Sequence, residues 1–464
     1  MNRLVWWLVW LWMLPVRLSA QADCRARLEA LLQSSALQTS EVGLAVYDLT
    51  ADRMVFAYQD RKLYRPASVL KLVTAVAALD RLGPDHPLST TLYGCGRVAE
   101  GVLEGDLYVV GGFDSEFSDE GMEALVDCVR RAGIRQVTGR LYGDVSMKDS
   151  LYWEAGWAWD DASYYFQPCL SPLMYHKGYV EVEATPVEAD SAARLVCRPA
   201  STFYTLRNCT RSRRPESGPF EAVRNWLEGG NEIVARGGVC GRRTDRVSMF
   251  PSSHFFLHVL RERLADAGIG VGPYAVRPCP ADSAFLLGTY AHTLRDALVP
   301  ALKRSDNLSA EALFYQLAAR GGRRHVGAAD GLCELDSLLA HLGFTPNDYR
   351  LADGCGVSLY NYVSPRLLLA CLQYAYRHPA LFAELYEALP QAGVDGSLRG
   401  RMKQGKAYRR VRAKTGSLTG VSSLAGYAHR SDGHLLAFVI INQNILESSV
   451  AKDFQHRVCE VLCH

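Results

Sequence analysis

The sequence lacks several features that would point to particular classes of protein. Its 51 Lys and Arg against 49 Asp and Glu leave a formal net charge of only +2, so no charge excess indicates nucleic acid or an anionic membrane as a partner. It has no internal repeats or low-complexity tracts, and after the first residues no apolar run approaches the about 20 residues of a membrane-spanning helix. What remains is an ordinary globular composition, 48% hydrophobic and 22% charged, in a chain of 464 residues that is long enough for two or three domains.

The N-terminus has the pattern of a secretory signal peptide. Arg3 supplies the basic region, residues 4–16 form an apolar run, and Ala20-Gln21-Ala22 is a small-x-small cleavage site. An uncleaved anchor is the alternative, but the apolar run is shorter than the about 20 residues of a membrane span. We therefore expect residues 1–22 to be removed, and the mature chain to be periplasmic, soluble and without a strong membrane anchor.

Cysteine is not scarce, and thirteen cysteines in an exported chain permit disulfide bonds, although the connectivity stays open. Three candidates for pairing lie in the middle of the chain: Cys197, Cys209 and Cys240. A second group lies near the C-terminus: His456, Cys459, Cys463 and His464. A metal site is one interpretation of this second group. Because i, i+3, i+7 is also the spacing of one helix face, we expect buried cysteines there and no metal.

The two ends of the chain predict one mostly antiparallel sheet with helices on both faces. Strands are expected at Glu41 to Leu49 and at Arg53 to Tyr58, followed by a helix that begins near Ser68. Towards the C-terminus, "RRVRAKTGSL" reads as a further strand, and "SSLAGYAHR" and "HLLAFVIINQN" flank the turn Ser431-Asp432-Gly433 as a hairpin.

The middle of the chain differs from its ends. Residues 90–169 are rich in short predicted strands and glycines, and residues 174–247 are more polar and rich in turns. The segments "HFFLHVLRERLADAGI" and "RSDNLSAEALFYQLAAR" each predict a helix. We interpret the middle as an insertion that itself contains an insertion.

Ser68 and Lys71 form the first candidate chemical motif. At i and i+3 of a helix the two side chains share a face, so the amine can serve as a general base beside a nucleophilic hydroxyl. A lysine among apolar residues near a second cation loses its proton more easily. A Ser-x-x-Lys match is common by chance, and Ser68 after Pro66 is also predicted to be a helix N-cap, a role that is compatible with nucleophilicity.

Two further motifs follow in order. Ser305-Asp306-Asn307 precedes a predicted helix, where it also reads as a capping cluster. Lys414-Thr415-Gly416 lies on a strand that is expected at the edge of the sheet, where a solvated strand lysine is the alternative. Together, Ser-x-x-Lys, Ser-x-Asn and Lys-Thr-Gly are the set used by acyl transferases that recognise β-lactams.

With these motifs the chain resembles the D-alanyl-D-alanine carboxypeptidase/endopeptidase family, the low-molecular-mass class C penicillin-binding proteins. The resemblance covers essentially the whole mature chain and includes "GDLYVVGG", "GWAWDDASYYFQP", "DGCGVS", "VSPRLLL" and "GVDGSLRGRM". It implies a three-layer α/β/α transpeptidase/β-lactamase-like domain interrupted by two nested smaller domains. The expected boundaries are 23–88 and 286–464 for the catalytic domain, 89–173 and 251–285 for the second domain, and 174–250 for the third.

The resemblance also implies roles for the motif residues. Ser68 is the nucleophile, Lys71 takes its proton, Ser305 relays a proton to the leaving amine, and Asn307 holds the substrate amide. The substrate-binding residues are Lys414, Thr415, Gly416 and Ser417, the last with its N–H in the oxyanion hole beside that of Ser68. No metal or organic cofactor is required; the partners are peptidoglycan peptides, with β-lactams as covalent inhibitors.

Substrate side-chain preference is less clearly implied. Cys355 replaces a usual serine, and Leu359 and Thr419 stand where many members carry arginine and glutamine near the side-chain pocket. Asp160 and Asp161 are candidates for contacting an amino group on the stem peptide, although a turn with packed aromatic residues explains them equally well.

Other functions on the same scaffold stay open at this point. The alternatives are a serine β-lactamase, an esterase and a catalytically silent wall-binding protein. No glutamate loop of the compact β-lactamases is evident between the first two motifs, and the intact motifs argue against a silent protein. The balance between carboxypeptidase and endopeptidase activity is not predicted by the sequence.

Overall fold

The computed structural model describes residues 24–34 and 37–464. The predicted signal peptide, residues 1–22, lies outside the described residues. Packing divides the chain into two compact units. The first contains the described part of Met1–Asp80 with Val299–Ser305 and Leu335–His464, and the second contains Arg81–Leu298 and Asp306–Glu334. The domain boundaries expected from the sequence stay predictions.

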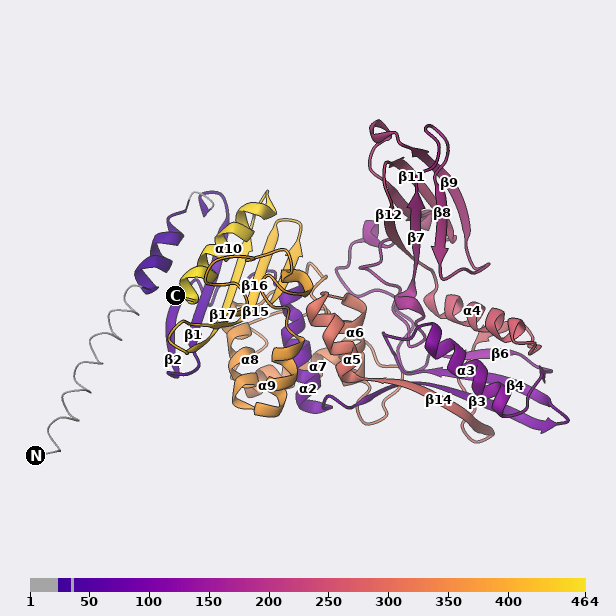
Figure 1. Ribbon diagram of the computed structural model, residues 1–464. Helices are drawn as coiled ribbons and strands as arrows, with labels where there is room; N and C mark the ends of the chain where they lie inside the picture. Colours follow the sequence, from indigo (N-terminus) through magenta and orange to yellow (C-terminus); the bar gives the residue numbers. More distant parts are fainter. Residues whose placement is uncertain (1–23, 35–36) are drawn as a thin grey trace, which may run out of the picture. The chain divides into compact units, whose positions relative to one another are not determined.

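The first unit is built on a five-stranded antiparallel sheet (Figure 1). Its strands in spatial order are β15 (Val411–Leu418), β16 (Val421–His429), β17 (Leu435–Gln443), β1 (Glu41–Asp48) and β2 (Arg53–Tyr58). The central strands are buried along almost their whole length, because both faces of the sheet are covered. The predicted strands and the hairpin at Ser431-Asp432-Gly433 are therefore confirmed.

Helices cover the two faces of this sheet (Figure 1). Alternate residues such as Leu44, Phe438 and Ile440 form a core with Phe454 and Val458 of the C-terminal helix. The helices of this unit include α2 (Lys71–Arg81), α8 (Pro365–Arg377), α9 (Pro379–Ala388) and α10 (Ser448–Leu462). Two more, α5 (Leu294–Lys303) and α7 (Ala328–His341), each contain one of the points at which the chain passes between units.

The second unit contains a six-stranded sheet and two three-stranded sheets. The large sheet consists of β3 (Pro87–Ala99), β4 (Val102–Gly111), β5 (Gln136–Val137), β6 (Leu141–Asp144), β13 (Tyr274–Val276) and β14 (Ala284–Thr293). One small sheet has β7 (Tyr179–Thr185), β8 (Arg194–Arg198) and β12 (Arg243–Ser248), and the other has β9 (Thr205–Ser212), β10 (Glu221–Arg224) and β11 (Glu232–Val239). These additional sheets fit the expectation of inserted smaller domains in an α/β protein.

Three helices accompany these sheets: α3 (Asp119–Arg131), α4 (Ser252–Asp266) and α6 (Asn307–Ala318). The last two confirm helices that the sequence predicts. The first was not predicted, because its segment lies in a stretch dominated by strand and glycine signals. Its buried residues, including Met122, Leu125 and Val129, follow helical spacing and join the core of this unit.

All thirteen cysteines are free thiols, so none of the possible disulfides is formed. Cys459 on α10 and Cys463, which caps the end of this helix, are both buried, as expected. His456 of the same group accepts a hydrogen bond from Arg401 Nε at 2.8 Å. Across residues 24–34 and 37–464, no helix has both the length and the apolar character needed to cross a membrane.

Candidate active site

Ser68 lies in a 3-10 turn, η2 (Ala67–Leu70), that leads directly into α2. The predicted N-cap role is wrong, because Ser68 is inside this turn and no side chain caps its start. The turn begins at Ala67 with a positive φ of 52°, a strained conformation for a residue with a Cβ. The Ser68 hydroxyl instead accepts a hydrogen bond of 2.8 Å from Lys71 Nζ, as the motif predicts.

Lys71 is only 1% exposed, and its amine has a second hydrogen-bond partner besides Ser68. Its Nζ donates a hydrogen bond of 2.7 Å to the backbone carbonyl of Cys355. A buried amine is costly unless its hydrogens have acceptors, so this carbonyl helps to keep Lys71 beside the serine.

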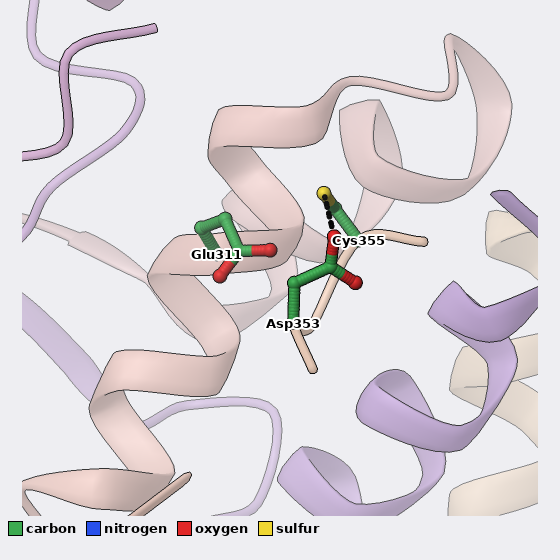
Figure 2. A group of neighbouring side chains, drawn as sticks. All are labelled: Glu311, Asp353 and Cys355. Carbon is green, nitrogen blue, oxygen red and sulfur yellow. Dashed lines mark hydrogen bonds between the residues drawn. The ribbon is translucent and has the colours of Figure 1, made fainter. Parts of the chain in front are cut away.

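The loop that carries this carbonyl is organised by the buried carboxylate of Asp353. Asp353 accepts hydrogen bonds from the N–H groups of Gly356 at 2.7 Å and Ser358 at 2.6 Å, and from the Asn361 amide at 2.8 Å. The Cys355 thiol also points to Asp353, at 3.6 Å (Figure 2). The contact to Lys71 is made by the backbone, so the cysteine at this position leaves it intact.

Lys414 and Ser305 form a second amine–hydroxyl pair. Lys414 is fully buried, and its Nζ donates to Ser305 Oγ at 2.7 Å and to the carbonyl of Thr415 at 2.6 Å. Burial, together with the nearby charge of Lys71, lowers the pKa of Lys414 well below its usual value. Two amines and two hydroxyls from three distant parts of the sequence thus belong to one group.

The Lys-Thr-Gly motif lies on β15, which forms one edge of the sheet as predicted. Gly416 packs against the turn that carries the serine: a Cβ at this position would lie 2.9 Å from the carbonyl oxygen of Pro66 and 3.0 Å from the nitrogen of Ser68. Only glycine permits this approach. The exposed Ser417 follows on the same strand.

Comparisons with known proteins agree with this geometry. Residues 24–463 match the D-Ala-D-Ala carboxypeptidase 3 (S13) family. The chain belongs to this family. The D-alanyl-D-alanine carboxypeptidase of Actinomadura sp. is 30% identical over 446 residues, which cover 90% of this chain and 81% of that protein.

The fold is also shared with solved structures. Penicillin binding protein 4 from Haemophilus influenzae superimposes with a TM-score of 0.83 at 23% identity, covering 94% of this chain and 99% of that one. A structure of the same Haemophilus protein in complex with a β-lactam has a TM-score of 0.78 at 22% identity and covers the same shares. The predicted family, the penicillin-binding-protein type of α/β fold and the enzyme class, a serine-type D-Ala-D-Ala carboxypeptidase acting in peptidoglycan, are therefore confirmed.

The carboxypeptidase family motif Ser-x-Asn is divided between the two compact units. Ser305 ends a segment of the first unit, whereas Asn307 begins α6 in the second. Asn307 Nδ2 donates a hydrogen bond of 2.6 Å to the carbonyl of Phe166. Asp306 caps α6 by accepting from the Ser309 N–H at 2.8 Å, so the capping interpretation holds for the middle residue of the motif.

Lys177 was not identified from the sequence, although it is bound to the middle residue of the motif. Its Nζ lies 3.2 Å from Asp306, 2.7 Å from Glu116 and 2.9 Å from Ser309 Oγ. Burial opposes its charge, but Asp306 and Glu116 outweigh burial and raise the pKa of Lys177. No local sequence pattern predicts this cluster, because 129 positions separate Lys177 from Asp306.

The residues proposed for side-chain recognition are accessible. Asp160 and Asp161 lie in a short 3-10 turn, η3 (Trp159–Asp161), of the second unit. Burial and the neighbouring Asp160 raise the pKa of Asp161. In the first unit, Leu359 is 43% exposed and Thr419 is exposed in the turn after β15. The two aspartates thus belong to the second unit, and Leu359 and Thr419 belong to the first.

Proposed function

We propose that this chain hydrolyses peptidoglycan stem peptides through an acyl-enzyme on Ser68. The hydrogen bond of 2.8 Å between Lys71 Nζ and Ser68 Oγ carries the proposal. A neutral Lys71 removes the hydroxyl proton as Ser68 Oγ attacks the carbonyl between two D-alanines. A serine ester forms, the C–N bond breaks, and the leaving amine takes a proton. Water then hydrolyses the ester.

The burial of both lysines supports a neutral base. Two ammonium groups in one buried site repel each other, so the pair gives up a proton more readily than two separate lysines. Lys71 is the lysine that is hydrogen-bonded to the proposed nucleophile, Ser68, and we propose that its amine is the neutral one in the reactive state. Burial and the charge of Lys71 lower the pKa of Lys414 in the free site. The terminal carboxylate of the substrate favours the protonated amine again, so that Lys414 attracts this carboxylate while Lys71 is neutral.

The remaining motif residues position the substrate. The N–H groups of Ser68 and Ser417 stabilise the oxyanion, and Thr415 donates to the terminal carboxylate. Ser305, bonded to Lys414, relays the proton to the departing amine, while Asn307 holds the substrate amide. Gly416 lets an extended peptide approach the β15 edge and add to the sheet as a strand.

Substrate range and location follow the same proposal. Release of a terminal D-alanine and cleavage of cross-links both use this chemistry, so we propose carboxypeptidase and/or endopeptidase activity. Asp160 or Asp161 recognises an amino group on the side chain of the stem peptide. The enzyme acts in the periplasm, and β-lactams inhibit it by acylating Ser68.

Labelling with a fluorescent penicillin tests this function. Wild type should form a covalent adduct that survives denaturing electrophoresis, and Ser68→Ala should not, although both remain folded. Labelling of the variant at the wild-type rate would refute the assignment of the nucleophile. A long-lived adduct supports the peptidase, and rapid turnover of penicillin would support the alternative of a β-lactamase.

A further inference from the structure

Two tryptophans in the second unit form an aromatic pair that the proposed chemistry does not use. Trp159 lies on η3, and Trp226 lies on a second 3-10 turn, η6 (Trp226–Glu228), between β10 and β11. Their ring centroids are 5.3 Å apart and their planes are inclined by 51°. Trp159 is nevertheless 72% exposed, and the adjacent Leu227 is 75% exposed. Such a group of apolar side chains left in water marks a binding surface more often than a structural one.

The pair is supported by a buried arginine that is bonded to both loops. Arg224, 3% exposed, donates to the carbonyl of Ala162, directly after η3, at 3.2 Å and to that of Gly230, near the end of the η6 turn, at 3.3 Å. Its Nε donates to the carbonyl of Ser248 at 2.8 Å. The base of η3 is held further by the buried Gln167, whose amide donates to the carbonyl of Ala158 at 2.7 Å. These hydrogen bonds hold the loops of the two tryptophans in place before a ligand arrives. Less conformational entropy is therefore lost when a ligand binds.

Two carboxylates share the short turn of Trp159. Asp160 and Asp161 follow Trp159 directly, and among the described residues neither carboxylate has a hydrogen-bond or ion-pair partner. Acceptors next to an aromatic face suit a ligand with an apolar ring face and an edge of hydroxyl and amide donors, which is the chemistry of an N-acetylated sugar. The same carboxylates disfavour an anionic membrane surface.

We propose that Trp159 and Trp226, with the adjoining carboxylates, bind the N-acetylated sugars of the glycan strand that carries the stem peptide. The proposal rests on the proposed function, because the sugar reaches the enzyme attached to its peptide substrate. The open face of Trp159 stacks on a pyranose ring and Trp226 backs it. One of Asp160 and Asp161 accepts hydrogen bonds from hydroxyl or amide groups of the sugar, while the other takes the amino group of the stem peptide. This contact adds affinity for polymeric substrate without any new contact to the scissile bond.

The test uses the mature protein and a soluble β-1,4-linked tetramer of N-acetylglucosamine, measured by calorimetry. Wild type should bind the tetramer; Trp159→Ala and Trp226→Ala should each weaken binding by about tenfold or more, and Trp159→Phe should weaken it less. Leu446→Ala, which removes a 99% exposed apolar side chain of the first unit, is the matched control and should bind as wild type does. All four variants should keep wild-type kcat/KM on a sugar-free synthetic stem peptide, while the two alanine variants release D-alanine more slowly from intact peptidoglycan.

Each of the following results would overturn the proposal. The first is that wild type does not bind the tetramer, and the second is that Trp159→Ala binds it as tightly as wild type does. The third is that the alanine variants lose as much activity on the sugar-free peptide as on intact peptidoglycan. Retention on lipid vesicles that depends on the pair, with no effect on the tetramer, would assign the surface to a membrane and also overturn it. Penicillin labelling of the same samples separates the two proposals. If the protein is labelled but does not bind the tetramer, only the sugar site is refuted. If the protein binds the tetramer but is not labelled, only the proposed acyl-enzyme function is refuted.

Discussion

Lys414 Nζ donates a hydrogen bond of 2.7 Å to Ser305 Oγ, although 109 positions separate the two residues. The amine is fully buried, and none of its hydrogen-bond partners among the described residues is a carboxylate. A buried amine without a counter-ion costs folding free energy, so its retention points to a role in substrate binding or catalysis rather than stability.

Replacement of Lys414 by methionine should separate stability from catalysis. The chain length is similar, and the desolvation cost of the amine disappears, so the melting temperature should stay the same or rise. We expect kcat/KM on a D-Ala-D-Ala peptide to fall by about a hundredfold or more, because the attraction for the terminal carboxylate is lost. Calorimetry and peptide kinetics check this; a less stable variant with normal kinetics would assign Lys414 a structural role.

Lys71→Arg tests the base. Arginine keeps a positive charge but cannot accept a proton near neutral pH, so acylation by penicillin should be nearly abolished and should not recover at moderately raised pH. Stopped-flow measurement of acylation from pH 6 to pH 10 gives the answer. If the variant retained most of the wild-type rate, the base would be sought at Ser305 or Lys414.

Cys355→Ser should be tolerated. The contact to Lys71 comes from the backbone carbonyl, and a serine hydroxyl can donate to Asp353 in place of the thiol. We expect kcat/KM to stay within about fivefold of wild type, since exchanging one donor to this carboxylate for another changes the free energy by about 1 kcal/mol or less. Cys333→Ser, at an exposed thiol, is the control. A much larger loss confined to Cys355→Ser would give the thiol itself a part in the site.

Leu359 and Thr419 predict a weak preference for a carboxylate on the third residue of the stem peptide. Leucine offers no hydrogen bond, and loss of a charge-assisted bond costs about 1.5–3 kcal/mol, roughly ten- to a hundredfold in specificity. We expect two synthetic peptides that differ only in this carboxylate to have kcat/KM values within about tenfold. Leu359→Arg should favour only the carboxylate peptide; an equal effect on both peptides would mean that the loop was merely repacked.

The stability of the first unit should fall in mild acid because of His456. Its Nε2 accepts from Arg401, whose guanidinium also donates to Gln455 at 2.8 Å, and burial followed by the charge of Arg401 lowers the pKa of His456 below 6.5. The unfolded chain therefore binds the proton at a higher pH than the folded chain does. The stabilisation is present above pH 6.5 and is lost as the pH falls through the lowered folded value.

Urea unfolding between pH 8 and pH 5 checks this sign. His456→Gln keeps an acceptor but does not titrate, so its unfolding free energy should decrease less across this range than that of wild type. His464→Gln, at the exposed end of the chain, is the control. Identical pH dependence in wild type and His456→Gln would exclude this histidine as the source.

The parts of the site that the sequence predicts are those encoded by short spacings. Ser68 and Lys71 are three positions apart, and Lys414 and Gly416 lie on a strand with clear alternation and flanking turns, so local geometry brings these pairs together. The five strands of the first sheet were predicted for the same reason.

The parts that were missed depend on tertiary structure. The 3-10 turn at Ser68 contains strained backbone, which residue propensities do not predict. The carbonyl of Cys355 becomes part of the site only because the fold brings its loop to Lys71. Lys177 reads as an ordinary charged residue until the fold places it between Asp306 and Glu116. A carbonyl carries no side-chain signature, so sequence reasoning has no means of finding it.

Because β15 lies at the edge of its sheet, it must be open to a substrate peptide and yet must not pair with other copies of the protein. Its outer N–H and C=O groups must stay unpaired to receive an extended peptide, yet an open strand edge is also a template for pairing between copies of a protein. The strand spans only eight residues, and its first half is already paired within the chain, where the Ala392 N–H donates to the Val411 carbonyl at 2.9 Å and the Ala413 N–H donates to the Pro390 carbonyl at 3.1 Å. The part of the edge that is left is long enough for a short peptide but offers little to a long strand of another copy, which limits aggregation through the substrate-binding edge.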